Sequence, residues 1–99
     1  MRKIEEQMVA AVLAAKEWKQ GNTEVTIRGD LRKTNEDTGT EFVVVSVWLH
    51  RNHIAWVELV RDLAGNKFMV HGLRVNQDTL DRWPTRTTKS RLRALGAKV

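Results

Sequence analysis

Apolar residues recur at three- and four-residue steps along the first twenty positions, a spacing typical of one face of a helix. The stripe comprises Ile4, Met8, Val12, Ala15 and Trp18. Gly21 follows it, and glycine readily adopts the left-handed conformation that closes a helix. The pattern therefore predicts an amphipathic helix that ends at residues 20–22.

The middle of the chain carries the patterns of β-strands. Residues 23–31 alternate between apolar and polar, which predicts a half-buried strand at a sheet edge. Residues 32–40 are polar and rich in turn formers, so we expect a loop there. Residues 41–50 are almost all β-branched or aromatic and predict a central strand. A further strand is predicted over 67–75, with an interruption at Gly72.

A hairpin turn is predicted at Arg51 and Asn52, because asparagine tolerates the left-handed conformation of a two-residue turn. This turn would pair His50 with His53 and Val47 with Trp56. In that register both faces of the sheet are apolar, so each face needs a cover. The helices can supply it, and a second copy of the protein is the alternative, which makes a homodimer an expectation to test.

The end of the chain is divided by Pro84, because a proline keeps the residue before it out of the helical conformation. Thr85 is suited to cap a helix over 86–95, and Gly96 is suited to close it. The segment 76–83 has two interpretations, a strand or a short helix capped by Asn76. The helical one would give the order of a helix-turn-helix motif, which binds DNA.

Together these elements predict a single domain, residues 1–99, of the α+β class. It has an N-terminal amphipathic helix, an antiparallel meander of three to four strands and a short basic C-terminal helix. The chain has no cysteine, which excludes a disulfide framework and a thiolate zinc site and suits a reducing cytoplasm. The apolar run 8–15 is too short for a membrane span, so we expect no membrane association.

The net charge of +5 arises entirely in residues 81–99, where six cations face one acid. Cations on a helix whose first turn carries hydroxyls and free N–H groups favour a phosphate backbone, so DNA or RNA is the expected partner. Trp83 would stack on a base or anchor a partner. The residues expected to contact nucleic acid are Arg82, Arg86, Thr87, Lys89, Ser90, Arg91 and Arg93.

Two other functions fit parts of the sequence. The same basic surface beside Trp83 could dock on an acidic host or defence protein as an inhibitor. His50 and His53, with His71 from the next strand, are candidates for a metal site in a nuclease, although nothing fixes His71 near the other two. No nucleophile motif, phosphate loop or carboxylate pair is evident, so we expect neither catalysis nor a cofactor.

Three segments of the chain form a recognisable set: GNTEV at residues 21–25, LHRNHIA at 49–55 and WPTRTTKSRLRAL at 83–95. The set resembles a group of small phage- and prophage-encoded proteins, most of them without an assigned function. In that group glycine tends to stand at the position of Arg51, and the stretch between hairpin and tryptophan is shorter. The resemblance implies a phage protein acting in the cytoplasm of an infected bacterium, and it transfers no catalytic residue.

Overall fold

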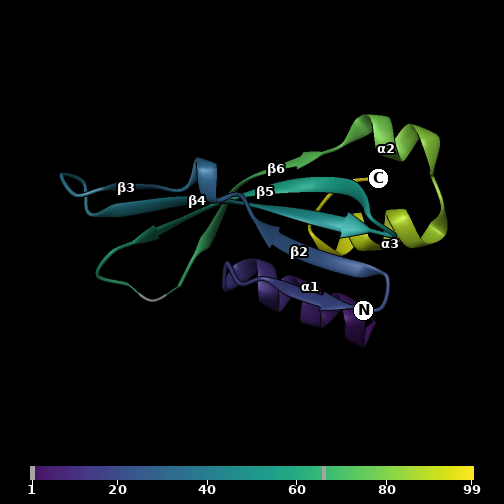
Figure 1. Ribbon diagram of the computed structural model, residues 1–99, viewed down its shortest axis with the longest axis horizontal. Helices are drawn as coiled ribbons and strands as arrows, with labels where there is room; N and C mark the ends of the chain where they lie inside the picture. The colour runs from purple at the N-terminus through teal and green to yellow at the C-terminus, as the bar shows by residue number, and fades with distance from the viewer. Residues whose placement is uncertain (1, 66) are drawn as a thin grey trace.

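A computed structural model describes residues 2–65 and 67–99 of the chain. In this part of the chain one antiparallel sheet of six strands is flanked by helices (Figure 1). The strand order is β1-β2-β4-β5-β6, and β3 pairs with β4 beyond the end of β2. In chain order the elements are α1 (Lys3–Leu13), β1 (Trp18–Gln20), β2 (Thr23–Ile27), the 3-10 turn η1 (Gly29–Leu31), β3 (Lys33–Asn35), β4 (Thr40–Leu49), β5 (Asn52–Asp62), β6 (Met69–Val75), α2 (Gln77–Arg82) and α3 (Arg86–Ala94).

The α+β class and both predicted helices are confirmed, but the expected number of three to four strands is wrong. The two additional strands, β1 and β3, have three residues each. Strands this short show no alternation in a sequence, and β3 is exposed along its whole length. Residues 32–40, predicted to be a loop, thus contain β3.

Helix α1 ends at Leu13 rather than near Gly21. Ala15 adopts a left-handed conformation with φ of 49°, and its N–H bonds the carbonyl of Val12 at 2.9 Å. The N–H of Lys16 bonds the carbonyl of Ala11 at 2.9 Å, which completes a Schellman motif. The chain then reverses, and Trp18 begins β1. Alanine gives no sequence signal for a left-handed position, and the helical spacing of apolar residues continues past it to Trp18.

Gly21 has a positive φ of 58°, as its position suggested, but it forms the turn between β1 and β2. Because β1 pairs with the outer side of β2, the predicted edge position of β2 is wrong. Strand β4 lies centrally, between β2 and β5, as predicted.

The hairpin turn between β4 and β5 lies one residue earlier than predicted. His50 and Arg51 have φ of 51° and 65°, both in the left-handed region that a type I′ turn requires. Leu49 consequently pairs with Asn52, and the predicted pair of His50 with His53 is not formed. Asn52 therefore lies outside the turn, as the first residue of β5.

The shifted turn changes which side chains of β5 face the core. After a bulge beside Val47, Val47 pairs with Ala55 instead of the predicted Trp56. A slip of one residue moves a strand's side chains to the opposite face. Ala55 is therefore buried on the core face and Trp56 lies on the other, the reverse of the predicted assignment.

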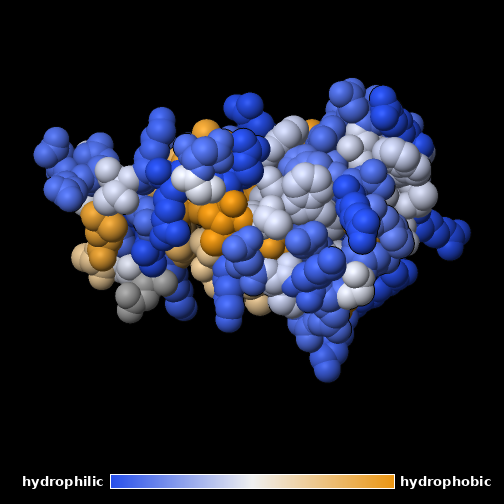
Figure 2. All heavy atoms as spheres, in the orientation of Figure 1, coloured by the Kyte–Doolittle hydropathy of each residue, from blue (hydrophilic) through white to orange (hydrophobic). Residues whose placement is uncertain are grey.

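Helices α1 and α3 pack on the core face of the sheet. Met8 of α1 and Leu92 of α3 are fully buried there, against valines of the central strands such as Val45 and Val57. Phe42, Trp48, Trp56 and Val60 on the opposite face do not belong to this core. In Figure 2 apolar side chains gather over the middle of the sheet, with hydrophilic side chains around them.

The opposite face is mixed, so the expectation of two apolar faces is wrong. It carries Ser46 and Glu58 between its aromatic residues. The His53 ring lies between two indoles, with centroids 5.0 Å from Trp48 and 4.2 Å from Trp56. Trp48 Nε1 donates to Thr26 Oγ1 at 2.9 Å on the neighbouring strand. These contacts join side chains of β2, β4 and β5 on this face.

The ambiguous segment before Pro84 is helix α2. The side chain of Asn76 accepts a hydrogen bond from the N–H of Thr79 at 3.3 Å, which caps its first turn. Trp83 leaves the helical conformation, with φ of −132°, and a three-residue turn then leads into α3. The helical interpretation is thus confirmed and the strand interpretation is wrong.

Candidate nucleic-acid interface

Helix α3 begins and ends where its sequence predicts. Thr85 Oγ1 accepts a hydrogen bond from the N–H of Thr88 at 3.2 Å, which caps the first turn. At the other end Gly96 has φ of 106°, and its N–H bonds the carbonyl of Arg93 at 2.9 Å. The helix presents two sides: Thr88 and Leu92 are buried against the sheet, while Arg86, Lys89 and Arg93 follow one another on the outer side.

The outer side of α3 borders a hollow that we call the cationic hollow. Its lining residues are Arg2, Pro84, Arg86, Lys89, Ser90 and Arg93. Four of the six are cations and none is an acid. In the part of the chain that the structure describes, none of the four cations forms a salt bridge. Arg93 Nε donates to Val99 O at 2.6 Å. A site of this composition attracts anions.

Arg2 is the member of this site that sequence reasoning missed. It precedes α1, and its backbone N–H donates to Glu5 Oε1 at 3.2 Å. Helices α1 and α3 are in contact, so this arginine joins cations that lie more than eighty positions later. The balanced charge of residues 1–40 gave no local signal that Arg2 would lie there.

Arg91 lies on the inner side of α3. Its Nη1 is 2.8 Å from Glu5 Oε2, and its Nε donates to Thr23 Oγ1 at 3.1 Å. Ser90 Oγ donates to the same carboxylate oxygen of Glu5. Arg91 and Ser90 thus hydrogen-bond to the body of the protein, and the cations of α3 on its outer side are Arg86, Lys89 and Arg93.

Glu5 stays ionised in this buried network. Burial raises its pKa, but hydrogen bonds from Ser90, the backbone N–H of Arg2 and Arg91, together with the charge of Arg91, outweigh it, so the pKa lies below the ordinary value. The ionised carboxylate fixes α3 against α1 and orients the helix so that its other cations face outward.

The remaining expected residues lie around the α2–α3 turn. Arg82 is exposed at the end of α2, and Thr87 is partly exposed on the first turn of α3. Trp83 is 44 % exposed and lines a second hollow, between this turn and the β4–β5 hairpin. We call it the Trp83 hollow, and its lining includes Leu49, Asn52, Ile54, Thr79 and Thr87.

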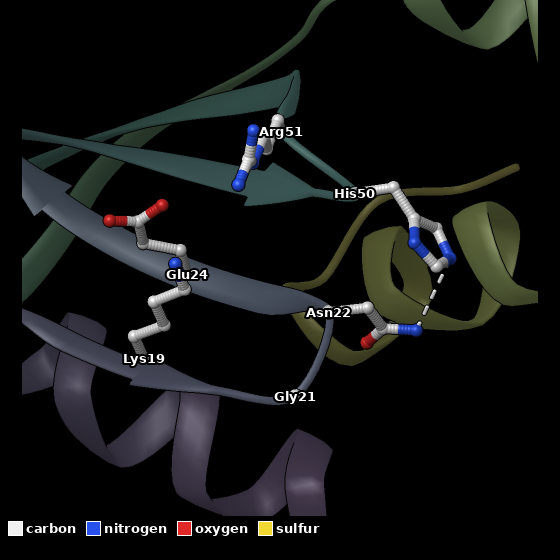
Figure 3. Close-up of a pocket in the computed structure, with 6 residues that line it drawn as sticks. All are labelled: Lys19, Gly21, Asn22, Glu24, His50 and Arg51. Atoms are coloured by element: carbon white, nitrogen blue, oxygen red, sulfur yellow. Dashed lines mark hydrogen bonds between the residues drawn. The ribbon is translucent and has the colours of Figure 1, made fainter.

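The three histidines considered as metal ligands make contacts with different parts of the fold. His50 lies at the hairpin tip, and its Nε2 is 3.3 Å from Nδ2 of Asn22 (Figure 3). His53 Nδ1 lies 3.1 Å from Asn76 Nδ2, and His71 packs edge-on against Phe42 with ring centroids 6.2 Å apart. Among the residues described, no three metal-binding side chains come together.

His53 is held in its neutral form. Burial disfavours the charged ring and the nearby charge of Arg28 adds to this effect, so the pKa of His53 lies below its ordinary value. The amide of Asn76 donates to Nδ1, which places the ring proton on Nε2. A neutral ring packed between two indoles is a structural group rather than an exposed ligand.

A third, open hollow lies at the ends of the β1–β2 and β4–β5 hairpins (Figure 3). Lys19, Glu24 and Arg51 line it, and Arg51 points away from the His50 ring. Because an acid stands among its cations, its charge is less one-sided than that of the cationic hollow. We therefore centre the candidate interface on α3.

Comparison with known proteins identifies the family and its source. The family model described as Kyanoviridae Gp96 protein matches residues 1–99. No curated protein and no solved structure matches the chain. No helix in the described part of the chain is long and apolar enough to cross a membrane. The phage source implied by the sequence resemblance is confirmed, since the chain belongs to the family of Kyanoviridae Gp96 proteins, which are phage proteins.

Proposed function

We propose that this phage protein binds nucleic acid through the phosphate backbone, without catalysis, at the cationic hollow and the adjoining turn. The observation that carries the proposal is the convergence of Arg2, Arg86, Lys89 and Arg93 on one hollow without an acid in its lining. Arg82 and Thr87 extend this surface across the turn. Lysine and arginine that neutralise phosphates supply most of the affinity of sequence-independent binding.

The experiment is a titration of fluorescently labelled DNA and RNA at several salt concentrations. We expect the logarithm of the affinity to fall linearly with the logarithm of the salt concentration. The double variant Arg86→Ala, Lys89→Ala should reduce that slope by about 2 on duplex DNA, because each phosphate contact contributes roughly 0.9. Lys33→Ala, Lys67→Ala removes the same charge from the opposite end and should leave the slope unchanged. Unaltered binding by the first variant would exclude this surface.

Protein binding is the second candidate function, with an acidic host or defence protein as the partner. It is favoured by the exposed Trp83 beside the cations, because tryptophan and arginine are enriched where interfaces gain most of their energy. A pull-down from nuclease-treated bacterial lysate separates the two functions. A retained stoichiometric protein would support the inhibitor, whereas loss of all partners would support nucleic acid.

We keep the prediction that the protein is not an enzyme and needs no cofactor, and that it acts in the bacterial host's cytoplasm. The metal-dependent nuclease considered from His50 and His53 is tested by incubation with DNA in the presence of Mg²⁺, Mn²⁺ or Zn²⁺. We expect the DNA to stay intact, and cleavage would contradict the prediction.

The homodimer also stays a prediction, and β6 is the surface that we propose for it. This strand is an outer strand of the sheet, and Met69 and Val70 are 71 % and 50 % exposed. Arg74, the charged residue of β6, forms an ion pair with Glu58 at 3.3 Å. An outer strand without unpaired charges can add a strand of a second copy.

A further inference from the structure

The Trp83 hollow differs in chemistry from the cationic hollow next to it. Its floor is apolar, because Leu49 and Ile54 are buried side chains with exposed fractions of 4 % and 1 %. Its rim is polar, with the side chains of Asn52, Thr79 and Thr87. An apolar floor with a few polar groups at the rim is typical of a ligand-binding site.

Trp83 is the group that makes this hollow suitable for a ring. Its indole lines the hollow, yet 44 % of the residue is exposed. Pro84 removes the residue from α2, and the turn holds it outside the core. Tryptophan with a free face stacks on nucleobases, and such stacking tolerates every base because each has a π face.

The rim is suited to bases in general rather than to one base. The hydroxyls of Thr85 and Thr88 lie 3.0 Å apart and hydrogen-bond to each other. Thr79 and Thr87 offer further hydroxyls at the rim, and a hydroxyl can both donate and accept. The hydroxyls of Thr79 and Thr87 can therefore bond the polar edge of any base and do not select a sequence.

The two hollows flank the same turn of the chain. Thr85, Thr87 and Thr88 line the Trp83 hollow, while Pro84, Arg86 and Lys89 line the cationic hollow. A nucleotide strand that crosses the first turn of α3 can thus place phosphates on the cations and one base beside Trp83. Residues at the start of α3 line both hollows, and this helix begins at the end of the molecule shown on the right of Figure 1.

We propose that the Trp83 hollow takes one unpaired nucleobase, so that the ligand of this interface is single-stranded nucleic acid rather than intact duplex. The inference rests on the function proposed above and specifies its substrate class. A base in a duplex is stacked on both faces and paired at its edge, and it enters a pocket only after it is flipped out at an energetic cost. A single strand does not have this cost.

The test compares three labelled ligands of equal length at one salt concentration: oligothymidine, its duplex with oligoadenine, and an abasic strand that keeps the phosphates. We expect the wild-type protein to bind oligothymidine at least tenfold more tightly than either of the others. Trp83→Ala should weaken oligothymidine binding by about 5- to 150-fold, the range for loss of one stacked base. Duplex and abasic binding and the salt slope should stay as in the wild type.

Trp83→Phe is the matched variant, because phenylalanine keeps an aromatic face. It should recover most of the affinity for oligothymidine, and the far-ultraviolet circular dichroism of both variants should match the wild type. Equal binding of all three ligands, or an equal loss on all three in Trp83→Ala, would overturn the inference while leaving phosphate binding intact. If the wild type bound none of the three ligands, the proposed function itself would be rejected. The same holds if the double variant Arg86→Ala, Lys89→Ala bound them as tightly as the wild type and with the same salt slope.

Discussion

Arg91 Nη1 lies 2.8 Å from Glu5 Oε2, and each side chain is only 4 % exposed. This ion pair joins α1 to α3 across 86 positions of the chain. Through this contact Arg91 holds α3 in place, while Arg86, Lys89 and Arg93 face outward. The orientation of the proposed interface therefore depends on a residue that does not belong to it.

Arg91→Met should destabilise the protein strongly, because it leaves the buried carboxylate of Glu5 without a cation, bonded only to Ser90 and the backbone N–H of Arg2. Removing one member of a buried pair costs about 3–5 kcal/mol in the free energy of unfolding. The double variant Glu5→Gln, Arg91→Met should recover part of that loss, since no buried charge remains. Urea denaturation of the three proteins measures the effect. A single variant as stable as the wild type would show that the pair is not needed.

His53 should make stability depend on pH near neutrality. Its pKa is lowered in the folded protein, first by burial and then by Arg28. Below the ordinary pKa of about 6.5 the unfolded chain takes up a proton that the folded protein does not bind. The free energy of unfolding should therefore decrease as the pH falls from 6.5 to the pKa of the folded state, by at most about 1.4 kcal/mol per pH unit.

Urea denaturation at a series of pH values between 7 and 5 measures this dependence. His53→Phe should flatten it, because that ring cannot take up a proton. Arg28→Gln should weaken it, because one of the two causes of the lowered pKa is removed. If His53→Phe keeps the slope of the wild type, the dependence arises elsewhere.

Ala15→Gly should stabilise the protein. Ala15 stands at the left-handed position that follows α1, with φ of 49°, and an L-residue pays about 1–2 kcal/mol for that conformation. Glycine avoids this cost but loses more backbone freedom on folding, so we expect a net gain of about 0.5–1 kcal/mol in thermal or urea denaturation. Gly96→Ala, at the equivalent position after α3, is the matched control and should shift stability in the opposite direction.

Arg2→Ala should reduce the salt slope of nucleic-acid binding by about 1, because it removes one of the cations that line the cationic hollow. Lys3→Ala is the matched control, since Lys3 is adjacent and exposed but does not line the hollow. Equal effects of the two substitutions on the slope would mean that the N-terminal segment contributes only general charge. The measurement is the same titration of labelled DNA against salt.

Val70→Lys should prevent dimerisation through β6, because a lysine on an outer strand opposes pairing with another strand. Analytical ultracentrifugation of the wild type should give twice the chain mass of 11.4 kDa. The variant should give the mass of one chain, with an unchanged circular dichroism spectrum. Leu13→Lys, at another exposed apolar residue, is the control and should remain dimeric. A wild type that sediments as a monomer would reject the proposed dimer.

The elements that the sequence predicted well depend on neighbours in the chain. Thr85, Pro84 and Gly96 set the limits of α3 through capping and backbone geometry, which act within a few residues. The elements it predicted poorly depend on distant partners. The left-handed conformations of Ala15 and His50 have no sequence signal, because packing rather than residue preference holds them there.

The candidate site also has one property that the sequence predicted and one that depends on distant contacts. Its charge was evident from the sequence, because six cations against one acid in residues 81–99 is a matter of composition. Which cations face outward was not evident, since the burial of Arg91 requires Glu5. The place of Arg2 in the cationic hollow requires the contact between α1 and α3.

The sequence by itself thus determined the α+β class, the basic helix and the position of Trp83, because hydrophobic spacing, capping and proline act locally. Only the tertiary structure decided the hairpin register, the buried ion pair and the joining of Arg2 to α3. These features depend on which side chains fit together when distant segments pack. A shift of one residue in strand register, or of one turn in the length of a helix, changes which residues are in contact but leaves the local pattern of apolar and polar residues unchanged.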